Sequence, residues 1–329
     1  MRAVVVKEKG GADQLVIKEV AKPSYREDEI LVRVKATAVN RADIAQREGM
    51  YPPPPGASPI LGLEFAGVVE EVGAEYQGKW HPGDRVFGLL AGGGYAEYAV
   101  VPGELVLPIP EHFSFEEAAA IPEVFLTAYQ CLFWIGRLQK GETVLIHAGA
   151  SGVGTAAIQL VRAAGATALV TVGSEEKQKF CLGLGAKHAF NYRDGAFSDK
   201  VLEATDGQGV DVVLDFVGAP YWQQNLKVLR MGGRLVFISA LGGTKLDQAS
   251  IGAILGKRLT VTGTTLRSRS LAYKEELNRD FASFALPRFV SGELKPIIDR
   301  VYPWTEVKEA HRYMEQNKNK GKIVLRIDE

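Results

Sequence analysis

Residues 143–165 read TVLIHAGASGVGTAAIQLVRAAG, and the fold of the chain can be inferred from this stretch. It contains a short apolar run, a glycine-rich turn from Gly149 to Gly154, and a helical segment that ends at Gly165. Glycine lets the backbone approach a pyrophosphate closely, and the first N–H groups of a helix attract the anion. We interpret the stretch as a dinucleotide cradle. A glycine-rich turn with only a packing role is the alternative.

Strand-like and helix-like segments alternate after this turn. Short β-branched runs lie at residues 168–172, 188–192, 211–217, 234–239 and 259–263, and most of them are followed by a helical pattern. This alternation is typical of a doubly wound parallel sheet. We therefore predict an α/β fold with a Rossmann domain over residues 123–264.

The first third of the chain has a different pattern. Alternating apolar runs such as EILVRVKATAV (29–39) and EFAGVVEEVG (64–73) are separated by turn signals that include Gly92–Gly94. This pattern predicts mostly antiparallel β structure. Pro52–Pro55 cannot continue a helix or a central strand, so we expect a stiff exposed loop there.

Helical patterns flank the predicted Rossmann domain. Ser114 and Glu117 have the capping-box spacing at the start of one helix, and a second is expected over 125–135. After residue 264 we expect helices at 273–284 and 305–317 and a strand at 322–327. This tail is too short for a core of its own, so residues 1–122 and 265–329 should form one domain.

Composition excludes several classes of protein. The chain has 329 residues, with 46% hydrophobic and 24% charged, enough apolar material for two cores. Lys plus Arg and Asp plus Glu number 39 each, so we expect neither nucleic acid nor a membrane surface as a partner. With no signal-peptide pattern and no apolar run near 20 residues, we predict a cytoplasmic protein. Cys131 and Cys181 are too few for a disulfide framework.

The end of the second strand of the predicted Rossmann domain selects the cofactor. An acid there binds the ribose hydroxyls of NAD and repels the 2′-phosphate of NADP. This chain has Gly173 and Ser174 at that point, followed by Lys177 and Tyr192. We therefore predict a 2′-phosphate pocket and NADPH as the cofactor. Glu175 and Glu176 count against this, unless they are solvent-facing acids in the first turn of a helix.

Several motifs resemble the zinc-free quinone oxidoreductase (zeta-crystallin-like) branch of the medium-chain dehydrogenase/reductase superfamily. They are AVNRAD (38–43), YPPPPGAS (51–58), ILGLEFAG (60–67), AAAIPE (118–123), LIHAGASGVGTAAIQL (145–160) and NKNKGKIVL (317–325). The resemblance covers essentially the whole chain. It implies a mostly β GroES-like catalytic domain beside the Rossmann domain, and the activity of an NADPH:quinone oxidoreductase.

The same resemblance bears on metal. Zinc-dependent relatives carry a cysteine and a histidine where this chain has Asn40 and Leu63, and only Glu64 is kept. The five histidines have no metal-ligand spacing and are interpreted as core or surface residues. We predict no metal site.

The resemblance also assigns site residues. Asn40, Tyr51, Thr127 and Ser151 are expected to line a cleft between the domains as the catalytic residues. Tyr51 could stack on a flat acceptor or donate a hydrogen bond, or only pack its loop. The expected cofactor-binding residues are Ser151, Gly152, Val153, Gly154, Gly173, Ser174, Lys177, Tyr192, Leu266 and Asn317.

Two other functions stay open. An NADPH-dependent enoyl or alkenone reductase would use the same scaffold with a proton donor, for which Tyr51 could serve. A non-catalytic, crystallin-like NADPH-binding protein belongs to another class. We also expect a homodimer, in which the apolar stretch RLTVTGTTL (258–266) pairs across a two-fold axis and hides an edge strand.

Overall fold

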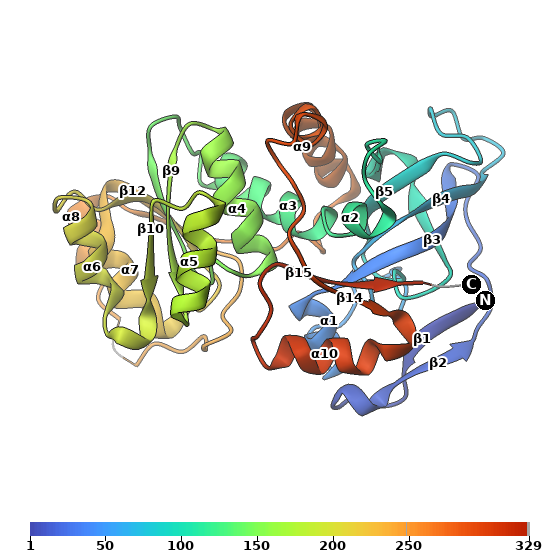
Figure 1. The fold of residues 1–329 in the computed structure, drawn as a ribbon, viewed down its shortest axis with the longest axis horizontal. Coiled ribbons are helices and arrows are strands. Elements are labelled where there is room, and N and C mark those ends of the chain that lie inside the picture. Colours follow the sequence, from blue (N-terminus) through green and yellow to red (C-terminus); the bar gives the residue numbers. More distant parts are fainter. Residues whose placement is uncertain (248, 328–329) are drawn as a thin grey trace. The chain divides into compact units, whose positions relative to one another are not determined.

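The computed structural model describes residues 1–247 and 249–327. The chain divides into two compact units, one formed by Met1–Leu126 with Leu266–Glu329 and the other by Thr127–Thr265. Figure 1 shows their elements along the chain. The domain boundaries predicted above, at 122/123 and 264/265, stay a prediction.

The second unit is built on a six-stranded parallel sheet with the order β10-β9-β8-β11-β12-β13. This is the strand order of a doubly wound dinucleotide-binding fold, as predicted. Its strands are β8 (Thr143–Ile146), β9 (Thr167–Val172), β10 (His188–Asn191), β11 (Val210–Asp215), β12 (Leu229–Phe237) and β13 (Thr260–Gly263). Every residue of β11 is buried, because helices cover both faces of a parallel sheet.

Helices connect these strands, because parallel neighbours need a crossover connection. They are α4 (Gly152–Ala163), α5 (Glu175–Leu184), α6 (Phe197–Ala204), α7 (Trp222–Val228) and α8 (Gly252–Lys257). Short 3-10 turns lie at Tyr192–Asp194 and Ala219–Tyr221. Cys131 and Cys181 are both buried, and neither forms a disulfide.

The first unit is mostly β, as predicted. Its main sheet has the order β14-β15-β3-β4-β5-β7, with β6 also paired to β3, and all pairs except β14–β15 are antiparallel. The strands are β3 (Glu29–Val39), β4 (Glu64–Val72), β5 (Arg85–Leu89), β6 (Tyr98–Pro102), β7 (Val106–Pro108), β14 (Ile298–Pro303) and β15 (Lys322–Arg326). A separate hairpin joins β1 (Arg2–Val6) to β2 (Leu15–Glu19).

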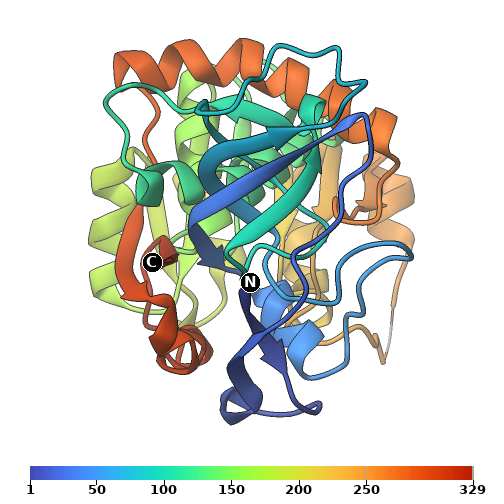
Figure 2. The same cartoon turned by 90° about the vertical axis from the view of Figure 1, so that its right-hand side faces the viewer.

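The C-terminal tail returns to this unit, as expected from its length. β15 pairs with β3, so that Ile323 lies opposite Val39 and Leu325 opposite Thr37; Figure 2 shows these strands, coloured red and blue. The unit's helices are α1 (Arg41–Arg47), α2 (Phe115–Ala119), α9 (Leu271–Ser291) and α10 (Val307–Glu315), with 3-10 turns at Ala12–Gln14, Gly103–Leu105 and Trp304–Glu306.

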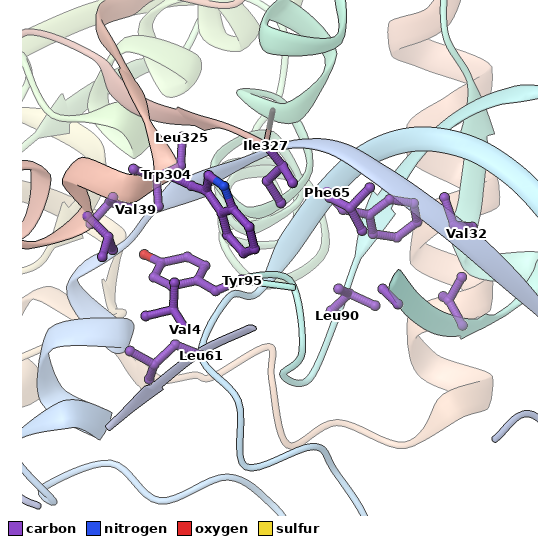
Figure 3. Packing of buried hydrophobic residues seen from close by; sticks show 14 of the residues in the cluster. Val4, Val32, Val39, Leu61, Phe65, Leu90, Tyr95, Trp304, Leu325 and Ile327 are labelled. Carbon is purple, nitrogen blue, oxygen red and sulfur yellow. The ribbon is translucent and has the colours of Figure 1, made fainter. Parts of the chain in front are cut away.

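The core of the first unit gathers side chains from both ends of the chain. Val4 and Leu61 lie beside Tyr95, and Trp304 and Leu325 come from the returning tail (Figure 3). Residues so distant in sequence cannot bury this surface unless the tail docks. The sheet and the tail therefore stabilise each other.

Several elements differ from the sequence predictions. The helix expected over 125–135 begins earlier, as α3 (Pro122–Tyr129), and continues as a π-helix over Gln130–Ile135. Pro122 fits a first helical position because its missing N–H has no partner there. The helix expected at 273–284 is the longer α9, which continues through Pro287. The capping box of Ser114 and Glu117 is confirmed at α2.

One core helical stretch also has the length and composition of a membrane span. The helical stretch Phe115–Ile135 is long and apolar enough to cross a membrane, with a mean hydropathy of 1.4. However, 78% of its most apolar window is buried inside the structure. Burial in the core accounts for this apolar composition, as in core helices generally.

Candidate functional site

The glycine-rich turn joins β8 to α4 in the order that a pyrophosphate cradle requires. A Cβ on Gly149 would lie 2.5 Å from Cβ of Val170, and one on Gly154 would lie 2.4 Å from the Ala148 carbonyl oxygen. Both positions therefore exclude any side chain. The Ser151 hydroxyl oxygen accepts a hydrogen bond from Gly154 N at 3.0 Å and caps α4. This contact gives Ser151 a structural role whatever else it binds.

A second cradle lies at the tip of β9. Ser174 caps α5 by accepting from Lys177 N at 3.2 Å. A Cβ on Gly173 would lie 2.4 Å from the Tyr192 hydroxyl oxygen, so the turn after β10 brings Tyr192 against this tip. Glu175 pairs with Lys179 at 2.7 Å, and both side chains are exposed. This pairing fits the interpretation of Glu175 as a solvent-facing acid.

A buried network of hydrogen bonds begins at His147, just before the glycine-rich turn. His147 Nε2 donates to Asn225 Oδ1 at 2.7 Å, and Asn225 Nδ2 donates to Asp215 Oδ2 at 2.7 Å. His147 Nδ1 then accepts from the Thr171 hydroxyl at 2.8 Å. Burial lowers the pKa of His147, which keeps the ring neutral in this tautomer. The network ties together residues at the carboxyl ends of β8, β9 and β11.

The carboxyl ends of the later strands form a hollow. A pocket of about 410 Å³ is lined by residues that follow β11, β12 and β13, among them Gly218, Ser239 and Thr264. Ligands of open α/β sheets bind at this edge. The sequence did not single out this segment, because its glycines and small residues match no short motif.

In the first unit, Asn40 and Glu64 hold a buried lysine. Lys322 Nζ lies 2.6 Å from Glu64 Oε1 and 2.7 Å from Asn40 Oδ1, and Asn40 Nδ2 donates to Glu64 Oε1 at 2.7 Å. The side chains of Lys322 and Glu64 are 3% and 0% exposed. Leu63, the other position compared with zinc-dependent relatives, is a buried apolar residue.

These residues do not fit zinc. An ammonium group already pairs with the carboxylate that would bind the metal, and neither leucine nor an asparagine amide replaces the thiolate and imidazole ligands that zinc prefers. Among residues 1–247 and 249–327, no three His, Cys, Asp or Glu side chains are grouped to hold a metal ion.

Two further carboxyl groups lie close to the Lys322–Glu64 pair. Glu64 Oε2 accepts from Glu123 N at 2.8 Å, at the start of α3. Burial raises the pKa of Glu123 to about 8, with repulsion from Glu64 adding to the shift. Burial also raises the pKa of Asp43 to about 6, although Asp43 accepts hydrogen bonds from Asn40 N and Gly62 N. The buried acids of this region therefore share few nearby cations, Lys322 and Arg267.

A chain of buried hydrogen bonds leads from Asp43 to α10. Arg47 Nη1 donates to His311 Nδ1 at 3.2 Å, and His311 Nε2 donates to the Tyr95 hydroxyl at 3.2 Å. Tyr95 in turn donates to Asp43 Oδ2 at 3.3 Å. Burial, and then Arg47, lower the pKa of His311 to about 3, so the ring is neutral. The chain runs from a buried cation to a buried carboxylate and holds α1 in place.

Tyr51 lies where the proline-rich loop begins and is half-buried. The Arg267 guanidinium lies over its ring, 5.3 Å from the ring centroid. Burial raises the pKa of Tyr51, with Arg267 acting in the opposite direction. Tyr51 therefore contacts a cation from outside its own loop.

The remaining predicted residues are distributed over both units. Thr127 is buried in the second unit, and Leu266 is buried at the start of the returning segment of the first. Asn317 ends α10 with a positive φ of 56° and accepts a hydrogen bond from Arg41. The predicted cleft, which needs Asn40 and Tyr51 to face Thr127 and Ser151, stays a prediction.

Sequence reasoning missed Lys322, Arg267 and Glu123 in the first unit. Lys322 opens an apolar strand, KIVLRI, and a lysine there needs a partner; that was an available signal. Glu123 directly follows a proline at a helix start, where acids are common, so it carried no signal of its own. Arg267 lies among other arginines and serines and could not be singled out.

Comparisons with known proteins agree with this architecture. Residues 26–111 match the family described as alcohol dehydrogenase GroES-like domain, and residues 152–283 match zinc-binding dehydrogenase. The quinone oxidoreductase of Lama guanicoe is 34% identical over 99% of this chain and 97% of its own length.

Solved structures are similar over almost the whole chain. The Escherichia coli quinone oxidoreductase complexed with NADPH has a TM-score of 0.89 and 30% identity, covering 99% of this chain and 100% of its own. An NAD-dependent alcohol dehydrogenase (TM-score 0.89, 32% identity) covers 100% of both chains. The CurK enoyl reductase (TM-score 0.88, 31% identity) covers 99% of both.

A GroES-like domain combined with a doubly wound nucleotide-binding domain defines the medium-chain dehydrogenase/reductase architecture. Full-length similarity then narrows the assignment. The chain belongs to the quinone oxidoreductase branch of the medium-chain dehydrogenase/reductase superfamily.

Proposed function

We propose that this chain is an NADPH-dependent quinone reductase that works without zinc. The observation that carries the proposal is the tip of β9, where Gly173 and Tyr192 take the place of the acid that would bind the ribose of NAD. The Lama guanicoe quinone oxidoreductase and the NADPH-bound Escherichia coli structure support the same reading.

The second unit supplies the residues that would hold NADPH. The turn residues Ser151, Gly152, Val153 and Gly154 would hold the pyrophosphate, and Gly173, Ser174, Lys177 and Tyr192 would hold the 2′-phosphate. Leu266 and Asn317 are proposed to complete the site from the other unit, and the pocket beside Ser239 suits the nicotinamide end. Bound NADPH supplies a hydride to the acceptor.

The first unit is proposed to be the catalytic domain, with boundaries near 122/123 and 264/265. Asn40 and Tyr51 would face the acceptor from this domain, and Thr127 and Ser151 from the other. Without a metal to polarise a carbonyl, the enzyme depends on positioning and on an acceptor that takes electrons easily. Quinones satisfy this requirement.

Zinc independence is supported by the Lys322 ammonium group. It forms short contacts with both Glu64 and Asn40, so a fixed positive charge already neutralises the carboxylate. Dialysis against a chelator should therefore leave activity unchanged. Stoichiometric zinc in the purified protein, with activity lost on removal and restored on return, would overturn this part of the proposal.

An enoyl or alkenone reductase is the second candidate. The likeness to the CurK enoyl reductase favours it, since that structure covers the chain as fully as the quinone oxidoreductases do. The discriminating experiment is an NADPH-oxidation screen with ortho- and para-quinones against α,β-unsaturated ketones. Quinone turnover well above enone turnover supports the proposal, and the reverse order supports the reductase of C=C bonds.

A cytoplasmic homodimer is the proposed form of the protein. β13 is an edge strand of the parallel sheet, and apolar side chains precede it in and near α8, with Ile251 and Leu255 64% and 70% exposed. Pairing of two β13 strands would cover both features. Light scattering should return a dimer mass at micromolar concentration. Thr264 N donates to Phe237 O of β12, so alternation turns the N–H of Val261 toward the open edge, and Val261→Pro, which removes this donor, should shift the mass to a monomer.

A further inference from the structure

Arg267 is a buried cation in the first unit that the proposed mechanism does not yet use. It is 5% exposed and lies just after the segment returns to this unit. Arg267 Nε donates to the Ala91 carbonyl at 2.8 Å, and Nη2 donates to Gln46 Oε1 at 2.6 Å. Gln46 also donates to the Pro59 carbonyl at 3.0 Å, so the guanidinium is anchored to the proline-rich loop.

The third nitrogen of this guanidinium has no acceptor. Within the described residues, Arg267 Nη1 is buried and makes no hydrogen bond. Nε and Nη2 share one edge of the planar group, and Nη1 extends from the opposite side. Buried donors on a charged group are rarely left unpaired in native proteins. An unpaired donor held this rigidly indicates a site for an acceptor that is not part of the protein.

The surroundings of Arg267 favour an oxygen that gains negative charge. The Tyr51 ring lies against the guanidinium and can form a flat wall beside Nη1. Tyr51, Asp43 and Glu123 are the titratable groups that act on Arg267. Burial raises the pKa of Glu123 to about 8, so near neutral pH this carboxyl is mostly protonated, and Asp43 is the carboxylate that still acts on Arg267.

We propose that Arg267 Nη1 binds the carbonyl oxygen of the acceptor and neutralises the negative charge that this oxygen gains during reduction, with Tyr51 as the adjacent wall. This inference rests on the proposed quinone reduction. It assigns Arg267 a role in electrostatic stabilisation. Neither the local sequence around Arg267 nor the comparison with zinc-dependent relatives indicates this role.

The chemistry balances without another reactant. NADPH, quinone and one proton give NADP⁺ and hydroquinone. The C–H bond of the dihydronicotinamide breaks, and its hydrogen and electron pair pass together to the quinone as hydride. One quinone oxygen ends as a hydroxyl that carries this hydrogen, and the other becomes a phenolate until it takes the one proton from solvent. Arginine stays protonated at any working pH, so it stabilises the phenolate and does not donate the proton. Donors placed where charge develops act most strongly on kcat.

The first test compares three variants of the full-length protein loaded with NADPH. Arg267→Met should lower kcat/KM for quinones on the order of 10²-fold, as expected for loss of one such donor. Arg267→Lys, which keeps a point charge, should recover part of the loss. Arg269→Met is the matched control, because Arg269 lies over Tyr273 instead. It should leave kcat/KM unchanged.

A purely structural role for Arg267 predicts a different pattern. Gln46→Ala removes one anchor of the guanidinium and leaves Nη1 in place, so it should cost much less than Arg267→Met. The NADPH dissociation constant, measured by fluorescence, should be the same in all variants. Equal losses in Gln46→Ala and Arg267→Met, or intact turnover in Arg267→Met, would overturn the inference.

The second test needs neither NADPH nor turnover. 4-Nitrophenol is a phenol whose ionised form absorbs visible light, and it can be titrated into the protein at several pH values. Arg267 should bind the phenolate and lower the pKa of the bound probe by about one unit, and Arg267→Met should abolish this shift. Equal phenolate affinity in both proteins would refute the inference. Absence of quinone turnover in the wild type, with the probe shift present, would instead refute the proposed function alone.

Discussion

The substitution Lys322→Met tests whether the buried ammonium organises the first unit. Methionine has similar length and no charge, so the variant leaves Glu64 buried with Asn40 Nδ2 and Glu123 N as its only partners among those described. Removing one member of a buried ion pair costs about 3–5 kcal/mol, because the other charge stays uncompensated. At about 2–4 °C per kcal/mol, the melting temperature should fall by roughly 6–20 °C.

The assay is thermal unfolding followed by circular dichroism, with chemical denaturation to obtain the free energy. The double variant Lys322→Met with Glu64→Gln should recover part of the loss, since no buried charge is then left unpaired. Lys318→Met is the control, because Lys318 is an exposed residue of the same tail. A loss below about 1 kcal/mol in Lys322→Met, as for a solvent-exposed pair, would refute the reasoning.

Three other predictions concern the cofactor, the acceptor and pH. Lys177→Ala should weaken NADPH binding by about 1.5–3 kcal/mol and leave NADH binding nearly unchanged in fluorescence titrations; equal losses would contradict a 2′-phosphate contact. Tyr51→Phe should keep most quinone turnover while Tyr51→Ala lowers kcat/KM about tenfold, and an inactive Tyr51→Phe would show instead that the hydroxyl is essential. Folding raises the pKa of Glu123 from 4.5 to about 8, so its contribution to stability is lost as the pH rises through this range. Glu123→Gln has no such loss, so its stability relative to wild type should increase between pH 5 and 8, by at most about 1.4 kcal/mol per pH unit, and parallel pH curves would exclude this linkage.

The nucleotide-binding unit could be predicted from the sequence because its signals are local. The strand, the glycines and the capping serine of Thr143–Gly165 follow one another directly in the sequence. In that order, each of them fits a single structural role. The absence of an acid at the two positions after Val172 can likewise be read directly from the sequence. Such features need no knowledge of distant contacts.

The polar centre of the first unit could not be predicted in this way. Lys322 reaches Glu64 and Asn40 because β15 pairs with β3, a register set by residues almost 300 positions apart. Arg267 depends on Ala91 and Gln46, which lie in a loop and a short helix far upstream. The apolar strand that Lys322 opens signals that this lysine needs a partner, but no sequence pattern identifies which distant residues that partner will be.

The contact between Gly173 and Tyr192 constrains how cofactor preference could evolve. An aspartate at position 173 would introduce the acid that binds NAD, but its Cβ would collide with the Tyr192 hydroxyl 2.4 Å away. The half-exposed Tyr192 ring must therefore move aside or be replaced before position 173 can carry an acid. Loss of Tyr192 alone would weaken the NADPH pocket without yet creating an NAD site. The two positions are therefore coupled in any exchange of one cofactor for the other.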